Sequence, residues 1–289
     1  MSQTPVFRFA PSPNGDLHLG HALSAITGYE MARRCGGRFL LRIEDIDLAR
    51  SRDHFITGIF EDLAWLGLIW EQPVLRQSEH FPVYAAAAQR LEVMGLVYPC
   101  FATRAEIAAS TSPSPTVDPD GAPLYPGLHK QLGSAEIADR KRRNEAFALR
   151  LDMERAVLHA RGLLDGQPLT FTELSADGRP ATIVAQPERW GDAVIVRKEV
   201  PSSYQLAVVV DDARQAVTHV TRGTDLYAAT DLQRLLQVLL GVPEPDYFHH
   251  RLIQDNSGRK LSKSALDTSL RRLRQDGMTR QSVRQMIGL

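Results

Sequence analysis

Two short apolar runs with a helical pattern between them stand at the start of the chain. Residues 6–10 (VFRFA) alternate apolar and polar side chains as a half-buried strand does, and PSPNGD then breaks the pattern. Apolar residues recur at helical spacing over 18–34, with Asp16 as the expected helix cap and the glycines at 36–37 as the stop. Residues 38–43 (RFLLRI) predict a second strand. This β-α-β unit of about 35 residues constrains the chain to a fold built on a parallel sheet.

Further helices and strands are expected on either side of an irregular stretch. Residues 110–127 (STSPSPTVDPDGAPLYPG) are too rich in Pro, Ser and Gly for regular structure, and we interpret them as part of an insert between two sheet halves. Strands are predicted at 193–197, 205–210 and 215–221. Helices are predicted at 51–66, 81–94, 134–145, 230–240 and 268–289. The predicted fold class is therefore α/β, with a doubly wound parallel sheet.

Composition excludes several classes of protein. Lys plus Arg equals Asp plus Glu at 34 each, so a nucleic-acid surface has to be a local patch. The longest apolar runs fall short of the roughly 20 residues that a membrane span needs, so no membrane partner is expected. The N-terminal segment lacks the basic and apolar regions of a leader, and Cys35 and Cys100 match no metal-ligand pair. We expect a protein of the reducing cytoplasm.

Two short motifs suggest phosphate chemistry. His18 and His21 of HLGH lie where a strand, a Pro/Gly turn and a helix meet, and a helix N-terminus suits an anion. Lys260 and Lys263 of KLSKS follow Gly258 in a stretch with little to bury. Taken alone, HLGH is compatible with an ordinary helix start and KLSKS with a solvated loop. Together, and in this order, they indicate a polyphosphate site in which lysines neutralise developing charge.

These motifs resemble the HIGH and KMSKS signatures of the class I aminoacyl-tRNA synthetases. RFAPSPNGDLHLGHA, RIEDID, YQLAVVVDD and VTRGTDL extend the resemblance to the glutamyl-tRNA synthetase branch, over residues 6–264. The resemblance implies a Rossmann-type catalytic domain that uses ATP with Mg²⁺, the metal accompanying the nucleotide. It implies an ATP site made by His18, Gly20, His21, Lys260 and Lys263, with His18, His21 and Lys263 as the catalytic side chains.

The same resemblance implies a glutamate pocket. Its residues would be Arg8, Phe9, Ala10, Pro11, Ser12, Glu44, Tyr204 and Arg222. The chemistry agrees, because Arg8 can offer a bidentate fork to a carboxylate and Glu44 can pair with the ammonium. Each of these residues also has a structural alternative. Arg8 or Arg222 would be a member of an ion pair, Glu44 a helix cap, and Tyr204 a residue at the edge of the core.

The length of the chain distinguishes two acceptors. It ends about 25 residues after KLSKS, without an anticodon-reading module, and so resembles the shortened glutamyl-queuosine tRNA(Asp) synthetases. That resemblance implies activation of L-glutamate without tRNA and its transfer to the queuosine base of tRNA(Asp). The alternatives are a shortened glutamyl-tRNA synthetase charging the 3′ end of tRNA(Glu), and a noncatalytic module binding nucleotide or RNA. The expected organisation is 1–98 and 191–264 as catalytic halves, 99–190 as insert and 265–289 as a helical extension, in a monomer.

Two further features of the sequence concern a zinc site and an arginine-rich tail. The family often holds zinc through Cys-x-Cys followed by Tyr-x-x-x-Cys, and here those positions are Cys100, Ala102, Tyr125 and His129. Because a closed zinc site needs four ligands, we expect no tight structural zinc. The arginine-rich tail (Arg271, Arg272, Arg274, Arg280, Arg284) is compatible with RNA contact and with a solvated amphipathic helix.

Overall fold

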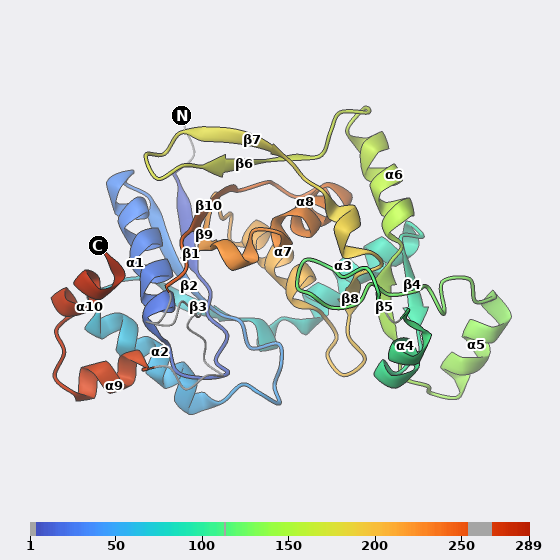
Figure 1. The fold of residues 1–289 in the computed structure, drawn as a ribbon, viewed down its shortest axis with the longest axis horizontal. Coiled ribbons are helices and arrows are strands. Elements are labelled where there is room, and N and C mark those ends of the chain that lie inside the picture. Colours follow the sequence, from blue (N-terminus) through green and yellow to red (C-terminus); the bar gives the residue numbers. More distant parts are fainter. Residues whose placement is uncertain (1–3, 113, 254–267) are drawn as a thin grey trace.

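A computed structural model describes residues 4–112, 114–253 and 268–289. Within them, seven strands form one sheet in the order β3-β2-β1-β9-β10-β6-β7, and only the β6–β7 pair is antiparallel (Figure 1). These strands are β1 (Val6–Phe9), β2 (Arg38–Ile43), β3 (Glu71–Arg76), β6 (Thr170–Leu174), β7 (Pro180–Val184), β9 (His219–Gly223) and β10 (Asp246–His250). The predicted α/β class with a doubly wound, Rossmann-like sheet is confirmed.

The order of the strands locates the site. The chain proceeds from β1 outward through β2 to β3, and β9 and β10 lie on the other side of β1. The strand order therefore reverses between β1 and β9, and open α/β sheets bind ligands at the carboxyl ends of the strands beside such a reversal. Because side chains alternate along a strand, Phe7 and Phe9 pack on one face of β1 while Arg8 lies on the opposite face.

Helices cover both faces of this sheet (Figure 1). Helix α1 packs on β1, β2 and β9, and Gly28 permits this approach because a Cβ there would lie 2.6 Å from Thr221 Oγ1. The helices are α1 (Leu19–Arg34), α2 (Asp53–Trp65), α3 (Phe81–Val93), α4 (Arg104–Ser110), α5 (Ser134–Arg142), α6 (Met153–Leu163), α7 (Tyr204–Arg214), α8 (Ala229–Leu240), α9 (Leu270–Gln275) and α10 (Arg280–Ile287), with short 3-10 helices η1 (Gln77–Glu79), η2 (Pro187–Trp190) and η3 (Thr224–Leu226).

The stretch between the two halves of the large sheet has structure of its own. Strands β4 (Val97–Cys100), β5 (Ala148–Leu151) and β8 (Val194–Val196) form a small antiparallel sheet. The β6–β7 hairpin joins the large sheet through β10, so the range 99–190 contributes strands to both sheets. Residues 111–127 contain no helix or strand where the structure describes them, as predicted for the stretch 110–127, but Ser110 is the last residue of helix α4. The division of the chain at 98, 190 and 264 stays a prediction.

One predicted strand is wrong. Residues 205–210 (QLAVVV) belong to helix α7, whose N-cap Ser203 accepts a hydrogen bond from the backbone of Leu206. Their β-branched residues favour a strand, but α7 is buried along most of its length, and burial removes the polar face that marks an amphipathic helix. Strand β9 also begins at His219, later than the predicted start at residue 215.

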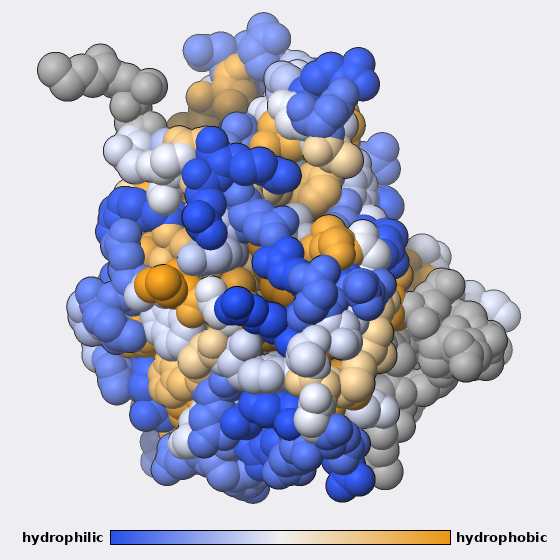
Figure 2. All heavy atoms as spheres, turned by 90° about the vertical axis from the view of Figure 1, so that its left-hand side faces the viewer, coloured by the Kyte–Doolittle hydropathy of each residue, from blue (hydrophilic) through white to orange (hydrophobic). Residues whose placement is uncertain are grey.

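The C-terminal helices pack against the start of the fold. Helix α9 lies on α2 and α10 lies on α1, and Leu270, Leu273, Val283 and Ile287 are buried there. Figure 2 views this end of the molecule, where hydrophilic side chains surround small apolar patches. Four tail arginines meet carboxylates of the protein, in the pairs Arg271–Asp16, Arg272–Asp276, Arg274–Glu61 and Arg284–Glu30. These pairs engage four of the five tail arginines, and contact of the tail with RNA stays a prediction.

Among the helices that the structure describes, none is long and apolar enough to cross a membrane.

Candidate active site

A cavity of about 1010 Å³ opens at the carboxyl ends of β1, β2, β9 and β10, beside the N-terminus of α1. It brings together every candidate residue for glutamate and ATP that the structure describes. These residues are Arg8, Phe9, Ala10, Pro11, Ser12, His18, Gly20, His21, Glu44, Tyr204 and Arg222. Lys260 and Lys263 lie outside the described residues. Positions more than 200 residues apart in sequence therefore line one cavity, although their individual roles remain predictions.

The two histidines of HLGH form the helix cap that we expected at Asp16. His18 is the N-cap of α1, and its Nδ1 accepts a hydrogen bond from the backbone N–H of Gly20 at 3.1 Å. His21 Nδ1 accepts from the backbone N–H of His18, also at 3.1 Å. Because both Nδ1 atoms accept, each neutral ring carries its proton on Nε2. This arrangement supplies two imidazole donors at the positive end of a helix, which suits a phosphate.

Gly20 is required by this close packing. A Cβ at position 20 would lie 2.9 Å from His18 Cε1, so a side chain there would displace the capping ring. The two imidazoles lie with their centroids 3.8 Å apart, which leaves little room for such a shift.

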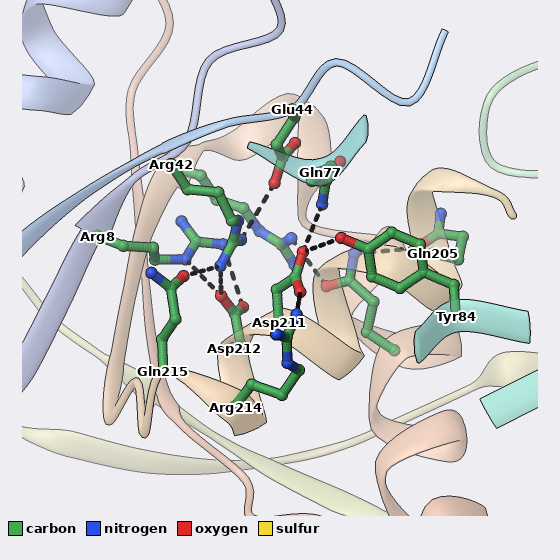
Figure 3. A network of polar contacts seen from close by, with 12 residues as sticks. Arg8, Arg42, Glu44, Gln77, Tyr84, Gln205, Asp211, Asp212, Arg214 and Gln215 are labelled. Carbon is green, nitrogen blue, oxygen red and sulfur yellow. Dashed lines mark hydrogen bonds and ion pairs between the residues drawn. The ribbon is translucent and has the colours of Figure 1, made fainter. Parts of the chain in front are cut away.

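Asp212 joins the two arginines behind the cavity (Figure 3). Its Oδ1 accepts from Arg8 Nε at 3.1 Å and from Arg42 Nη1 at 2.8 Å. Arg42 also donates to Glu44 Oε1 at 3.1 Å and to Gln215 Oε1 at 2.9 Å. Two cations and two carboxylates thus alternate in a buried network, and only Arg8 and Glu44 of the four line the cavity. The sequence patterns did not identify Arg42 and Asp212 as residues of the site. The available signal was the pair of aspartates, Asp211 and Asp212, that follows the apolar run at 206–210.

Burial and charge act against each other in this network. Burial opposes ionisation of Asp212, but Arg8 and Arg42 together outweigh it, so the pKa of Asp212 is lowered. Burial raises the pKa of Glu44, although Arg42 and Arg8 oppose that shift. Glu44 is therefore a carboxylate whose charge depends on nearby cations, and a substrate ammonium would add one.

The neighbouring Asp211 fixes α7 in the fold. Its Oδ2 accepts from Tyr84 Oη at 2.7 Å and from Gln77 Nε2 at 3.0 Å, and its Oδ1 accepts from Arg214 Nη1 at 3.1 Å (Figure 3). Burial, together with Asp211, raises the pKa of Tyr84, which keeps the phenol protonated as a donor. The two successive aspartates therefore have different roles: Asp211 anchors α7 in the fold, and Asp212 pairs with Arg8 and Arg42.

Arg222 is a buried cation with neutral partners. Only 4% of the residue is exposed, and its Nε, Nη1 and Nη2 donate to His249 Nε2 (3.1 Å), Gln233 Oε1 (2.9 Å) and Thr230 Oγ1 (2.7 Å). Among the described residues, no carboxylate pairs with it. A buried cation without a counter-ion is costly, so the cavity beside Arg222 favours an anionic ligand.

Tyr204 directly precedes residues 205–210, for which we predicted a strand. It is the first residue of α7 rather than a neighbour of a strand, and it lines the cavity near the helix N-terminus. Burial raises the pKa of its phenol, so the group stays protonated and can donate a hydrogen bond.

The four positions of the family's zinc pattern do not fit a closed zinc site. His129 Nδ1 accepts from the backbone N–H groups of Phe101 at 3.0 Å and Ala102 at 3.1 Å. Cys100 Sγ lies 3.2 Å from Tyr125 Oη, which also accepts from the His129 backbone N–H at 2.9 Å. The candidate ligand atoms are thus engaged with one another and with the backbone, and Ala102 supplies none. The described ranges contain no group of three or more His, Cys, Asp or Glu residues placed to hold a metal.

Comparison with known proteins identifies one family over nearly the whole chain. The sequence model for class I tRNA synthetases (E and Q), catalytic domain, matches residues 6–289. A glutamyl-Q tRNA(Asp) synthetase of Rhodobacter capsulatus is 44% identical over 98% of this chain and 100% of that protein. One of Symbiobacterium thermophilum is 38% identical over 96% of this chain and 83% of that protein.

A solved structure agrees with the fold. The crystal structure of a glutamate tRNA ligase from Elizabethkingia meningosepticum, in complex with its amino acid, superposes with a TM-score of 0.71 at 26% identity. The match covers 91% of this chain and 52% of that one. The chain therefore belongs to the class I tRNA synthetases of the E and Q type, in the branch that contains the glutamyl-Q tRNA(Asp) synthetases.

Proposed function

We propose that this protein activates L-glutamate with ATP, without tRNA, and transfers the glutamate to the queuosine base in the anticodon loop of tRNA(Asp). The observation that carries the amino-acid part is Arg222, a buried cation with neutral partners in a cavity that also holds Glu44. An anion and a cation on one small ligand satisfy both side chains, as an acidic amino acid does. The names of the two relatives support the acceptor.

The glutamate pocket uses opposite charges at separate points. Arg222 binds a carboxylate of the substrate, and Arg8, steadied by Asp212, contributes a second cation. Glu44 pairs with the ammonium, and Tyr204 donates from its phenol. The last residue of β1 and the segment after it, from Phe9 through Ser12, form the floor of the pocket.

The ATP site lies at the N-terminus of α1. The backbone around Gly20 and the Nε2 donors of His18 and His21 bind the phosphates. Lys260 and Lys263 are proposed from the sequence to neutralise the polyphosphate from the KLSKS segment. Mg²⁺ arrives with ATP and needs no cage of protein ligands.

The first step is a displacement at phosphorus. A carboxylate oxygen of glutamate attacks the α-phosphorus, the bond to the bridging oxygen breaks, and pyrophosphate leaves with that electron pair. The protein contributes alignment and cationic donors matched to the phosphoryl oxygens in the transition state. His18, His21 and Lys263 are the side chains that we assign to this role.

In the second step the acyl group passes to a hydroxyl of queuosine and AMP leaves. We propose that the anticodon loop enters the cavity from the side on which longer relatives receive the acceptor end. We further propose a cytoplasmic monomer that needs no structural zinc, because hydrogen bonds already engage Cys100, Tyr125 and His129.

Pyrophosphate exchange into ATP tests the activation step. Exchange should require glutamate, proceed without tRNA, and be weak with glutamine or aspartate. Arg222→Gln should raise the KM for glutamate about tenfold to hundredfold, the range for losing a hydrogen bond to a charged group, and leave the KM for ATP unchanged. Arg234→Gln is the matched control, because Arg234 binds Glu244 outside the cavity. Exchange that depends on another amino acid, or on none, would refute the proposal.

A further inference from the structure

Glu173, on the β6–β7 hairpin, is connected to Arg222 through the side chain of His249. Glu173 of β6 accepts the backbone N–H of His249 with Oε1 at 3.0 Å and meets His249 Nδ1 with Oε2 at 2.7 Å. On the other side of the ring, Arg222 Nε lies 3.1 Å from His249 Nε2. The three side chains come from adjacent strands, because β10 lies between β6 and β9.

These contacts fix the tautomer of His249. A carboxylate accepts hydrogen bonds, so the atom facing Glu173 Oε2 is a protonated Nδ1. The neutral ring then presents Nε2 as an acceptor, and Arg222 Nε–H is the donor that meets it. The opposite tautomer would set two N–H groups against each other at this contact.

The imidazole also keeps a negative charge away from Arg222. Gln233 and Thr230 accept from the two terminal nitrogens, so three of the five N–H donors of the guanidinium have neutral protein acceptors. Direct pairing with Glu173 would orient Arg222 equally well but would cancel its charge. The ring between them transmits the orientation and leaves the positive charge for a ligand.

We propose that Glu173 and His249 are positioning residues that orient Arg222 for the carboxylate of glutamate while keeping its charge uncompensated. This inference rests on the proposed function, which makes Arg222 a substrate-binding residue. It adds the β6–β7 hairpin to the recognition of the amino acid, although Glu173 itself does not line the cavity.

Acidification should disrupt this arrangement. Burial lowers the pKa of His249, as do Arg222 and His250, whereas the hydrogen bond and charge of Glu173 raise it. The other titratable groups facing the ring are Tyr227 and Tyr247. The ring is therefore neutral at pH 7 and above, and protonation at lower pH would turn Nε2–H toward Arg222. The KM for glutamate should therefore rise as the pH falls, whereas the KM for ATP should stay unchanged.

Glu173→Gln tests the arrangement by two separate readouts. An amide in place of the carboxylate no longer selects the Nδ1–H tautomer, so the KM for glutamate at pH 8 should rise about fivefold to tenfold, the loss of one hydrogen bond. Removal of a group that raises the pKa of His249 should also move the acid limb of the KM profile to lower pH. Glu244→Gln is the matched control, because Glu244 braces the same strand through the Thr172 backbone N–H at 3.1 Å and should change neither readout.

Nitrogen-15 spectra of His249 provide a test that does not depend on activity. The wild-type protein should show a protonated Nδ1 and an unprotonated Nε2, and Glu173→Gln should show a mixture. A wild-type ring protonated on Nε2 would overturn the proposal, whether or not the variant folds. If glutamate is activated but Glu173→Gln leaves the KM and its pH profile unchanged, the positioning role is wrong and the proposed function stands. If the tautomer is as expected but glutamate is not the substrate, the proposed function fails instead.

Discussion

His18 and Ser269 form an isolated antiparallel bridge, and the backbone N–H of Leu270 donates to the carbonyl of Leu17 at 2.7 Å. The residue that caps α1 is thereby tied to the segment that opens α9. This contact joins the histidine motif to the chain that follows KLSKS, so the C-terminal helices brace the end of the cavity at the N-terminus of α1, where we propose that the phosphates bind.

Leu270→Ala should therefore destabilise the fold. Leu270 is fully buried, and removing a buried leucine side chain costs about 2–5 kcal/mol in unfolding free energy. Urea unfolding measures this loss. Leu289→Ala is the control, since Leu289 is 47% exposed and should change stability by less than about 0.5 kcal/mol. Equal effects of the two substitutions would contradict the bracing role.

Lys263→Ala should lower the rate of glutamyl-adenylate formation by more than tenfold. We propose that the ammonium of Lys263 stabilises charge on the phosphoryl group in the transition state. A tenfold loss of rate corresponds to only about 1.4 kcal/mol. Single-turnover formation of the adenylate is the measurement. Lys141→Ala is the control, because Lys141 pairs with Glu92 on the surface. A rate within tenfold of wild type would show that Lys263 has been assigned wrongly.

Asp212→Asn should destabilise the protein and weaken glutamate binding together. The change leaves Arg8 and Arg42 buried with Glu44 as their remaining carboxylate, and breaking a buried pair costs about 3–5 kcal/mol. Chemical unfolding and the KM for glutamate are the two measurements. Asp139→Asn removes an exposed pair partner on α5 and should change stability by about 0.5 kcal/mol or less. A neutral Asp212→Asn would mean that the network does not hold Arg8.

The stability of the wild-type protein should respond to the ionisation of Asp62. Burial raises its pKa to about 6, although Arg274 and Arg271 oppose the shift. A raised folded pKa favours the protonated form, so this group's contribution is fully present below about pH 4 and is lost as the pH rises through about 6. Asp62→Asn should remove up to about 3 kcal/mol of this pH dependence between pH 4 and pH 8. Denaturant titrations of the wild type and of Asp62→Asn at pH 4 and pH 8 measure the free energies of unfolding. An equal change between the two pH values in both proteins would contradict the raised pKa.

Purified protein should contain far less than one equivalent of zinc. The double substitution A102C with H129C restores thiolates at the two departing positions and should bind zinc, with a melting temperature that falls on chelation. A102C alone is the control and should not gain tight zinc, because His129 remains bonded to the backbone. About one equivalent in the wild type, by metal analysis, would overturn the prediction.

Local patterns predicted the elements that carry most of the cavity. Strand β1, helix α1 and strand β2 were predictable because glycine and proline mark their ends and their apolar spacing is regular. Helix α7 was not, because its AVVV run is buried on most sides and periodicity cannot separate such a helix from a strand. The cap at His18 was also missed, because histidine is an uncommon cap and Asp16 is a common one.

The contacts behind the cavity depend on long-range packing. Asp212 meets Arg8 across 204 positions of sequence, and Glu173 meets His249 across 76. Such pairs become visible only once the strand order is known, since nothing in the local sequence of β6 suggests that it joins β10. The resemblance to a family identified the residues that we propose to contact the substrates, whereas the residues that support them came from the three-dimensional arrangement.

Transfer of labelled glutamate tests the central claim most directly. The substrates are tRNA(Asp) with queuosine, the same tRNA without it, and tRNA(Glu), each with and without its 3′-terminal adenosine. We predict label only on tRNA(Asp) that contains queuosine, with equal amounts whether or not the terminal adenosine is present. Label on tRNA(Glu) that disappears with the terminal adenosine would contradict the account and assign the protein to ordinary aminoacylation.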